Sequence, residues 1–193
     1  MCGYILGLGD RHVSNILIDK TTAEVVHIDF GIAFEQGLVL PTPETVPFRL
    51  TRDIEAGMGV CGVEGVFRKS CERTLEVLRN NSKTIISILE VLLYDPLYTW
   101  TVTPAEAYNR QLNDDQEEND YGVSCTSSSL QFTNEENVNA TAERALLRLR
   151  QKLQGIVEGG THTSVEGQVQ KLLQQARDPS NLCRLFHGWQ PYL

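Results

Sequence analysis

The sequence predicts a mainly helical fold that carries one small β-hairpin. Two observations lead to this prediction. First, two short β-rich runs near the start of the chain, residues 15–18 and 24–28, flank a polar stretch typical of a turn. Second, apolar residues recur at helical spacing through much of the remaining chain. The helical stretches are residues 63–80, 83–94, 133–153 and 164–176.

The predicted helices have recognisable boundaries. Ser82 and Ser164 can each cap the start of a helix, and residues 133–136 form a Thr-x-x-Glu capping box. The Asp-Pro pair at 178–179 ends a helix, because proline has no backbone N–H to donate. Gly155 is expected to close the helix that begins near residue 133. The apolar sides of these helices indicate a helical core.

A long connection separates the hairpin from the first long helix. Residues 32–61 contain six glycines and prolines, which favours irregular structure throughout. A loop of this length inside a compact domain usually has a functional role.

The formal net charge of −8 is concentrated in one stretch. Residues 112–137 hold seven acids and no base, so the remaining chain has 18 acids, 17 bases and a charge near zero. Residues 111–132 are poor in apolar residues, and we expect them to be a disordered acidic insert. No basic surface is predicted, so we expect no direct nucleic acid contact by this segment.

Composition also limits the class of protein. No run of about 18 apolar residues could span a bilayer, and the start of the chain lacks the basic region of a signal peptide. Five scattered cysteines show no zinc-ligand spacing. These features predict an intracellular protein with free, partly buried thiols.

The first 31 residues carry the pattern of a phosphoryl-transfer site. Asp10 and Asn15 have the Asp-x-x-x-x-Asn spacing of a kinase catalytic loop. The Asp-Phe-Gly sequence at 29–31 follows the predicted hairpin. Because the hairpin folds Asp29 back toward Asn15, their oxygens can share a magnesium ion. Either motif alone is weak evidence, but their combination across a hairpin is specific.

The residues beside Asp10 allow more than one interpretation. Gly7 and Gly9 do not form a complete phosphate-binding G-x-G-x-x-G loop, because residue 12 is His12. They are better explained as a tight turn that presents Asp10. His12 either hydrogen-bonds the transferred phosphoryl group or braces the loop as a structural histidine.

Several motifs resemble those of a known kinase group. Residues 7–17 (GLGDRHVSNIL) are similar to the catalytic loop of the phosphatidylinositol-kinase-like superfamily, and residues 27–35 (HIDFGIAFE) are similar to its metal-binding loop. Residues 41–51 (PTPETVPFRLT) resemble the activation loop of the phosphatidylinositol-3-kinase-related protein kinases. Residues 161–193 resemble the FATC segment that ends those kinases. The resemblance implies a kinase C-lobe of α+β type followed by C-terminal FATC helices.

The resemblance also implies roles for individual residues. Asp10 and His12 are the catalytic candidates, and which of them accepts the proton stays open. Asn15 and Asp29 are the candidates for binding Mg²⁺ (or Mn²⁺) and, through it, ATP. The family further implies phosphorylation of serine or threonine before glutamine, double-strand-break signalling, a nuclear location, regulators bound at the FATC segment and a homodimeric parent protein.

The candidate activation loop bears on the choice of substrate. A lipid kinase needs basic side chains there to hold a polyanionic headgroup, yet no Lys or Arg lies between Asp29 and Phe48. This favours a protein kinase over a phosphoinositide kinase. The activation-loop candidates are Phe30, Gly31, Pro43, Glu44, Val46, Pro47, Phe48 and Arg49.

The sequence divides into four segments. Residues 1–110 are the expected C-lobe, 111–132 the insert, 133–160 a C-lobe helix and 161–193 the FATC segment. No glycine-rich phosphate loop or lysine strand precedes Asp10, so we expect a C-lobe fragment that is inactive alone. A non-catalytic interaction fragment is the remaining alternative.

Overall fold

The computed structural model describes residues 1–22, 24–93, 135–156 and 161–189. Within these ranges the fold is mainly helical with a single two-stranded antiparallel sheet, which confirms the predicted class. The main elements are α1 (Cys2–Leu6), β1 (Ile16–Ile18), β2 (Val25–His27), α2 (Arg52–Gly57), α3 (Val66–Asn80), α4 (Ser82–Leu93), α6 (Glu135–Gln154), α7 (Val165–Arg177) and α8 (Pro179–Leu182). Short 3₁₀ turns lie at Val13–Asn15, Gln36–Val39, Gly62–Glu64 and His187–Trp189.

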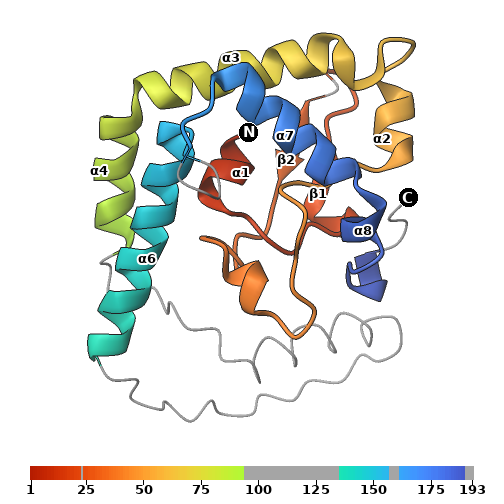
Figure 1. Cartoon of the computed structure of the whole chain (residues 1–193). Helices are drawn as coiled ribbons and strands as arrows, with labels where there is room; N and C mark the ends of the chain where they lie inside the picture. The colour runs from red at the N-terminus through yellow and green to blue at the C-terminus, as the bar shows by residue number, and fades with distance from the viewer. Residues whose placement is uncertain (23, 94–134, 157–160, 190–193) are drawn as a thin grey trace.

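The core lies where α3, α6 and α7 meet over α1. In Figure 1, α3 runs along the top, α4 and α6 lie side by side, and α7 crosses the body toward α8. Leu75 of α3 and Val169 of α7 are fully buried there. Burial of this apolar surface is the main stabilising contribution. The other buried members are Ile5, Leu50, Val63, Cys71, Leu89, Leu149, Leu153, Leu173 and Ala176.

A buried glutamine joins all four of these helices. Gln168 of α7 donates from Nε2 to the carbonyl of Lys152 at 3.1 Å and to the Tyr4 hydroxyl at 3.2 Å. Its Oε1 accepts a hydrogen bond from Arg79 of α3. A buried amide must be satisfied in this way, because an unpaired polar group in the core is costly. The C-terminal helix is therefore fixed to the same core as the N-terminal residues.

The helix boundaries follow the sequence with two exceptions. Ser164 caps α7 by accepting from the Gly167 N–H at 3.1 Å, and Gly155 ends α6 with φ of 71°. Ser82, however, is the first residue of α4 rather than its cap. The loop 32–61 is also less irregular than expected, because Thr51 caps the six-residue helix α2. Residues 111–132 and Thr133 lie outside the described residues.

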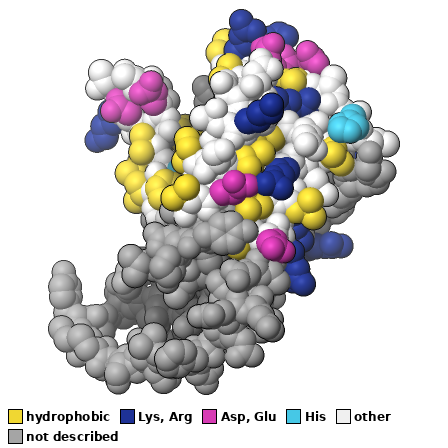
Figure 2. Space-filling model, turned by 90° about the vertical axis from the view of Figure 1, so that its left-hand side faces the viewer, with side chains coloured by type: hydrophobic (Ala, Val, Ile, Leu, Met, Phe, Trp, Pro, Cys, Tyr) yellow, Lys and Arg dark blue, Asp and Glu magenta, His cyan; other side chains and the backbone are white. Residues whose placement is uncertain are grey.

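Apolar side chains remain exposed on two surfaces. The hairpin exposes Leu17, Ile18, Val25 and Val26 on its strands. Figure 2 shows a second group of hydrophobic side chains on the face to which α4 and α6 contribute.

Cys71 is buried, whereas Cys2, Cys61 and Cys183 are exposed, so the expectation of partly buried thiols holds for only one of these four. None of the described helices is long and apolar enough to cross a membrane.

Candidate active site

The turn after α1 brings Asp10 to the surface. Gly7 has φ of 61°, and a Cβ there would lie 2.5 Å from the backbone nitrogen of Glu35. Only glycine fits both constraints. Gly9 donates its N–H to the Ile32 carbonyl at 2.9 Å, so the turn lies directly against the metal-binding loop at residues 27–35. The two glycines thus shape the turn, as the sequence predicts.

Asp10 is held by three residues from three parts of the chain. It has φ of 52°, a left-handed conformation that is unfavourable for a residue with a side chain. Its N–H donates to Glu44 Oε1 at 2.7 Å, and its carbonyl accepts from Asn15 Nδ2 at 2.9 Å. Its carboxylate oxygen Oδ1 accepts from the indole Nε1 of Trp189 at 3.2 Å. The bonds to Glu44 and Asn15 hold the backbone in this strained conformation, which is typical of functional sites, and the bond from Trp189 holds the side chain.

Arg11 joins the catalytic loop to the residues that follow the second strand of the hairpin. The side chain is buried, with 5% of its surface exposed. Nε donates to the Gly9 carbonyl at 2.6 Å, and the two terminal nitrogens donate to the carbonyls of Ile28, at 2.8 Å, and Asp29. Burial lowers the pKa of Arg11, while the nearby carboxylates of Asp10 and Asp29 oppose that shift. The guanidinium therefore fixes Asp29 beside the loop that carries Asp10.

The hairpin register brings Asn15 and Asp29 to the same end of the sheet. Ile16 pairs with His27, and the N–H of Ile28 donates to the Asn15 carbonyl at 3.2 Å. Asn15 is buried, whereas Asp29 is exposed and has φ of 55°. Asp29 Oδ1 accepts from the Gly31 N–H at 2.9 Å, which orients the carboxylate.

This donor set suits a hard divalent cation. Asn15 uses Nδ2 for its bond to Asp10, so its side-chain oxygen is available to a ligand, and Asp29 has a second oxygen beyond its bond to Gly31. Among the described residues, no group of three or more His, Cys, Asp and Glu side chains could hold a metal. Magnesium commonly binds through one or two protein oxygens, with substrate phosphates and water completing the shell. Asn15 and Asp29 fit that pattern.

The side chains of His12 and Asp10 have different hydrogen-bond partners: His12 bonds within its own loop, and Asp10 bonds to the C-terminal tail. The ring of His12 is partly exposed, and its Nδ1 accepts from the Ser14 N–H at 3.3 Å. This contact braces the 3₁₀ turn and is compatible with either interpretation of His12. Asp10 is only partly exposed as well, and Trp189 lies against one of its carboxylate oxygens.

The activation-loop residue Glu44 lies beneath the catalytic turn. A Cβ at Gly9 or Gly37 would meet Glu44 Oε2 at 2.7 or 2.4 Å, so both glycines make room for this carboxyl. Burial raises the pKa of Glu44 to about 7, although its bond to the Asp10 N–H acts in the opposite direction. Glu44 thus titrates near neutral pH in direct contact with Asp10.

The other activation-loop candidates divide between surface and interior. Phe30 is 56% exposed at the end of the hairpin, and Gly31 and Pro43 are exposed as well. Phe48 packs edge-on against Phe67 with ring centroids 6.4 Å apart. Arg49 points inward, donating to the carbonyls of Arg11, at 3.2 Å, and Trp189. Val46 and Pro47 are partly buried and line a neighbouring cavity.

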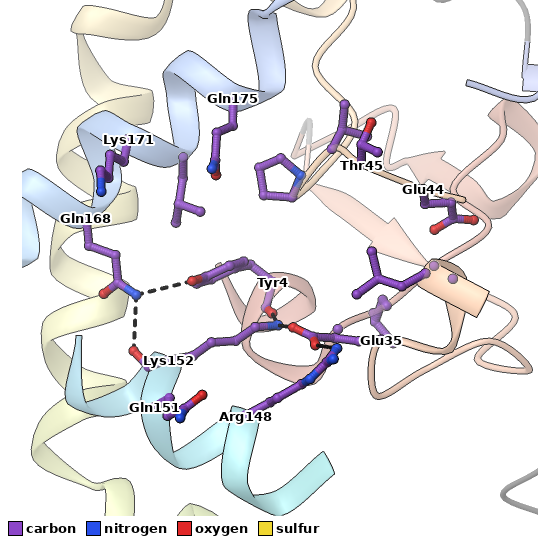
Figure 3. Close-up of a pocket in the computed structure, with 18 of the residues that line it drawn as sticks. Tyr4, Glu35, Glu44, Thr45, Arg148, Gln151, Lys152, Gln168, Lys171 and Gln175 are labelled. Atoms are coloured by element: carbon purple, nitrogen blue, oxygen red, sulfur yellow. Dashed lines mark hydrogen bonds and ion pairs between the residues drawn. The ribbon is translucent and has the colours of Figure 1, made fainter. Parts of the chain in front are cut away.

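That cavity, of about 550 Å³, lies behind the catalytic turn. It is bounded by the turn, the activation loop, α6 and α7, and none of Asp10, His12, Asn15 and Asp29 lines it. Glu35 forms ion pairs there with Arg148 and Lys152 (Figure 3). Burial alone would raise the pKa of Glu35, but its two cationic partners outweigh burial and lower it. These pairs join the end of the metal-binding loop to α6.

Comparison with known proteins agrees with this geometry. The family model for phosphatidylinositol 3- and 4-kinases matches residues 1–102, and the FATC domain matches residues 162–193. The chain belongs to the phosphatidylinositol 3- and 4-kinase family. The sequence motifs also resemble those of the ataxia-telangiectasia-mutated (ATM) kinase. The comparisons confirm a resemblance of ATM type.

The similar proteins span animals, plants and fungi. The chain is 55% identical to a serine-protein kinase ATM of Sus scrofa over 99% of its residues, and 54% identical to a serine/threonine-protein kinase ATM of Arabidopsis thaliana over 100%. It is 47% identical over 98% to a serine/threonine-protein kinase TEL1 of Saccharomyces cerevisiae. The chain spans only 6%, 5% and 6% of these relatives, respectively.

Solved structures show the same fold. The FAT and kinase domain of CtTel1 matches all of this chain with a TM-score of 0.77 and 42% identity, the chain covering 11% of it. A complete CtTel1 dimer with C2 symmetry matches equally well over 6% of its length. The predicted kinase C-lobe fold is thereby confirmed.

Sequence reasoning missed two contributors to the site. Arg11 entered only as part of the catalytic-loop motif, and Trp189 only as part of the segment 161–193 that resembles FATC. A buried arginine leaves no periodic signal, and a contact between Asp10 and Trp189 depends on the folded chain.

Proposed function

We propose that this chain is the catalytic C-lobe and tail of an ATP-dependent serine/threonine protein kinase of ATM type. The observation that carries the proposal is the junction at the end of the hairpin. Arg11 donates to the Asp29 carbonyl, Ile28 donates to Asn15, and Asn15 donates to Asp10. Phosphoryl transfer requires chiefly this kind of positioning together with electrostatic stabilisation.

Each residue takes a role that its surroundings support. Asp10 accepts the proton of the substrate hydroxyl through the carboxylate oxygen that Trp189 does not occupy. His12, partly exposed in the same loop, hydrogen-bonds the phosphoryl group. Asn15 and Asp29 hold magnesium, which when bound offsets the negative charge of the ATP phosphates. Manganese has the same preference for oxygen ligands and can replace it.

The substrate is proposed to be a protein. From residue 29 to residue 48 there is no lysine or arginine, and Arg49 is directed at backbone carbonyls of Arg11 and Trp189. A polyanionic lipid headgroup would therefore meet no basic side chain from this loop. By relation to ATM and TEL1 kinases, we propose Ser-Gln and Thr-Gln sites, double-strand-break signalling and a nuclear location. A phosphoinositide kinase is the competing hypothesis.

The parent protein is proposed to be a homodimer, because a C2-symmetric CtTel1 dimer contains the same fold. Regulatory proteins are proposed to act at the FATC segment.

The exposed apolar side chains of β1 and β2, such as Ile18 and Val25, form a surface that a second kinase lobe can cover. Without such a cover the chain is proposed to be inactive, and it then serves at most as an interaction fragment.

A transfer assay on the full-length protein tests the proposal. Labelled phosphate from ATP is followed into a Ser-Gln peptide, an Ala-Gln peptide and vesicles that contain phosphatidylinositol. We expect label in the Ser-Gln peptide alone, and its loss on Asp10→Ala. Label in the lipid instead of the peptide would establish the competing lipid-kinase activity.

A further inference from the structure

Trp189 of the C-terminal tail makes direct contact with the carboxylate of Asp10. The indole Nε1 donates to Asp10 Oδ1 at 3.2 Å, although the two residues lie near opposite ends of the chain. Trp189 is 4% exposed, so its N–H is largely shielded from water. A buried tryptophan N–H needs an acceptor, and here the acceptor is the carboxylate proposed to take the substrate proton.

The position of Trp189 is itself fixed by the activation loop. The guanidinium of Arg49 lies over the indole ring, 5.7 Å from its centroid, and donates to the Trp189 carbonyl. The same guanidinium donates to the carbonyl of Arg11, the residue next to Asp10, at 3.2 Å. Arg49 therefore touches both the tail and the catalytic loop. A cation over an aromatic face adds attraction where water is excluded.

We propose that Trp189 is a positioning residue for phosphoryl transfer, orienting the Asp10 carboxylate under the control of Arg49. Glu44 and Asn15 fix the backbone of Asp10, but neither holds its carboxylate group. The bond from Trp189 holds Oδ1, and it thereby directs Oδ2 toward the substrate hydroxyl. A preorganised carboxylate avoids reorientation during the reaction, which is a recognised source of rate enhancement.

This arrangement makes the tail part of the active site and gives it a means of regulation. A protein that pulls the tail from Arg49 would free the Asp10 side chain while leaving Asn15 and Asp29 in place. The expected signature is a fall in kcat with little change in the KM for ATP. A tail that only stabilises the fold would instead change the amount of active enzyme and the melting temperature.

The inference rests on the proposed kinase function, and the test separates the two. Trp189 is replaced in the full-length protein by 3-benzothienylalanine, which keeps the shape of the ring and exchanges N–H for sulfur. Trp189→Phe is the coded counterpart. Steady-state kinetics with a Ser-Gln peptide give kcat and both KM values, and thermal unfolding reports on folding. Cys183→Ala, at an exposed thiol of the same tail, is the control.

We expect the benzothienyl variant to lose roughly 10- to 100-fold in kcat, the range for a hydrogen bond to a charged group. Its KM for ATP and melting temperature should match the wild type, as should all values for Cys183→Ala. Arg49→Gln should also lower kcat, and adding it to Trp189→Phe should give less than the product of the separate effects, because both act on one carboxylate.

A benzothienyl variant with the kcat of the wild type would overturn the positioning role while leaving the kinase function intact. The positioning role would also be overturned if the benzothienyl variant lost activity only in proportion to a loss of folded protein. A wild-type protein that does not phosphorylate the peptide would contradict the kinase function, and the inference would fall with it.

Discussion

Residues 7–15, the part of the catalytic loop before strand β1, and the hairpin at residues 16–28 adjoin in sequence but are held in different ways. Asp10 in the loop is bonded to Glu44 and Trp189, which lie far along the chain. The described hairpin strands pair with each other, and they expose side chains such as Ile18 at 62% and Val25 at 58%. The comparison shows that distant parts of the same chain hold the loop in place, whereas the hairpin leaves an apolar surface exposed.

The largest expected effect comes from removing the Asp29 carboxylate, which follows directly after the hairpin. Asp29→Ala in the full-length protein should reduce phosphoryl transfer by about 10²–10⁴-fold, comparable to loss of a positioned acid or base. The expected cause is loss of the carboxylate proposed to hold the metal. Radiolabel transfer to a Ser-Gln peptide measures it. Asp19→Asn is the control, because Asp19 lies in the hairpin turn and its oxygen caps the N–H groups of Thr21 and Thr22.

A fully active Asp29→Ala protein would contradict the metal-binding role. Equal loss in Asp29→Ala and Asp19→Asn would show that the hairpin is needed only for folding.

The second prediction concerns the exposed hairpin. Purified alone, the chain should bind magnesium-ATP with a Kd at or above about 1 mM, a binding free energy of only about 4 kcal/mol. The hairpin strands adjoin the proposed metal site, and their apolar side chains, such as Ile18 and Val25, are exposed. Titration calorimetry measures the affinity, with circular dichroism to verify folding. Micromolar binding by the isolated chain would show that the hairpin does not need a cover.

The third prediction concerns Glu44, which supports the catalytic loop. Its pKa of about 7 in the folded protein exceeds its ordinary value of 4.5, so folding favours the protonated form. The protonated Glu44 side chain therefore contributes fully to the stability of the fold below pH 4.5, and this contribution is lost as the pH rises through 7. Relative to Glu44→Gln, the wild type should lose up to about 3 kcal/mol of unfolding free energy between pH 4 and pH 8.

Urea unfolding of both proteins across that pH range measures the difference. Glu35→Gln is a useful comparison, because its cationic partners lower the pKa of Glu35 and its pH dependence should have the opposite sign. If the unfolding free energies of the wild type and Glu44→Gln changed with pH in parallel, Glu44 would not be buried in solution.

The smallest expected effect is on the stability of the hairpin itself. Ile18→Thr exchanges an exposed apolar side chain for another β-branched one, so the unfolding free energy should change by less than about 0.5 kcal/mol. Leu75→Ala, at a fully buried core position, should cost about 2–5 kcal/mol. Urea unfolding compares the two. A large loss for Ile18→Thr would show that the chain covers its own hairpin.

Much of this molecule was predictable because its signals are local. The hairpin follows from alternation and a polar turn, and the helix α7 follows from Ser164 and the Asp-Pro break at 178–179. The spacing of Asp10 and Asn15, with Asp29 beyond the hairpin, identified the candidate site. By contrast, α2 was missed, because a six-residue helix is unstable alone and depends on the Thr51 cap and its packing.

The sequence by itself determined which groups are available for chemistry and in what order they occur. Only the tertiary structure decided how they are held: Trp189 against Asp10, Glu44 under Gly9, and Arg49 between the tail and the catalytic loop. The physical reason is the distance along the chain over which each interaction acts. Turns, caps and helical periodicity act within a few residues, whereas a hydrogen bond between side chains far apart in sequence exists only after the apolar core has brought their backbones together.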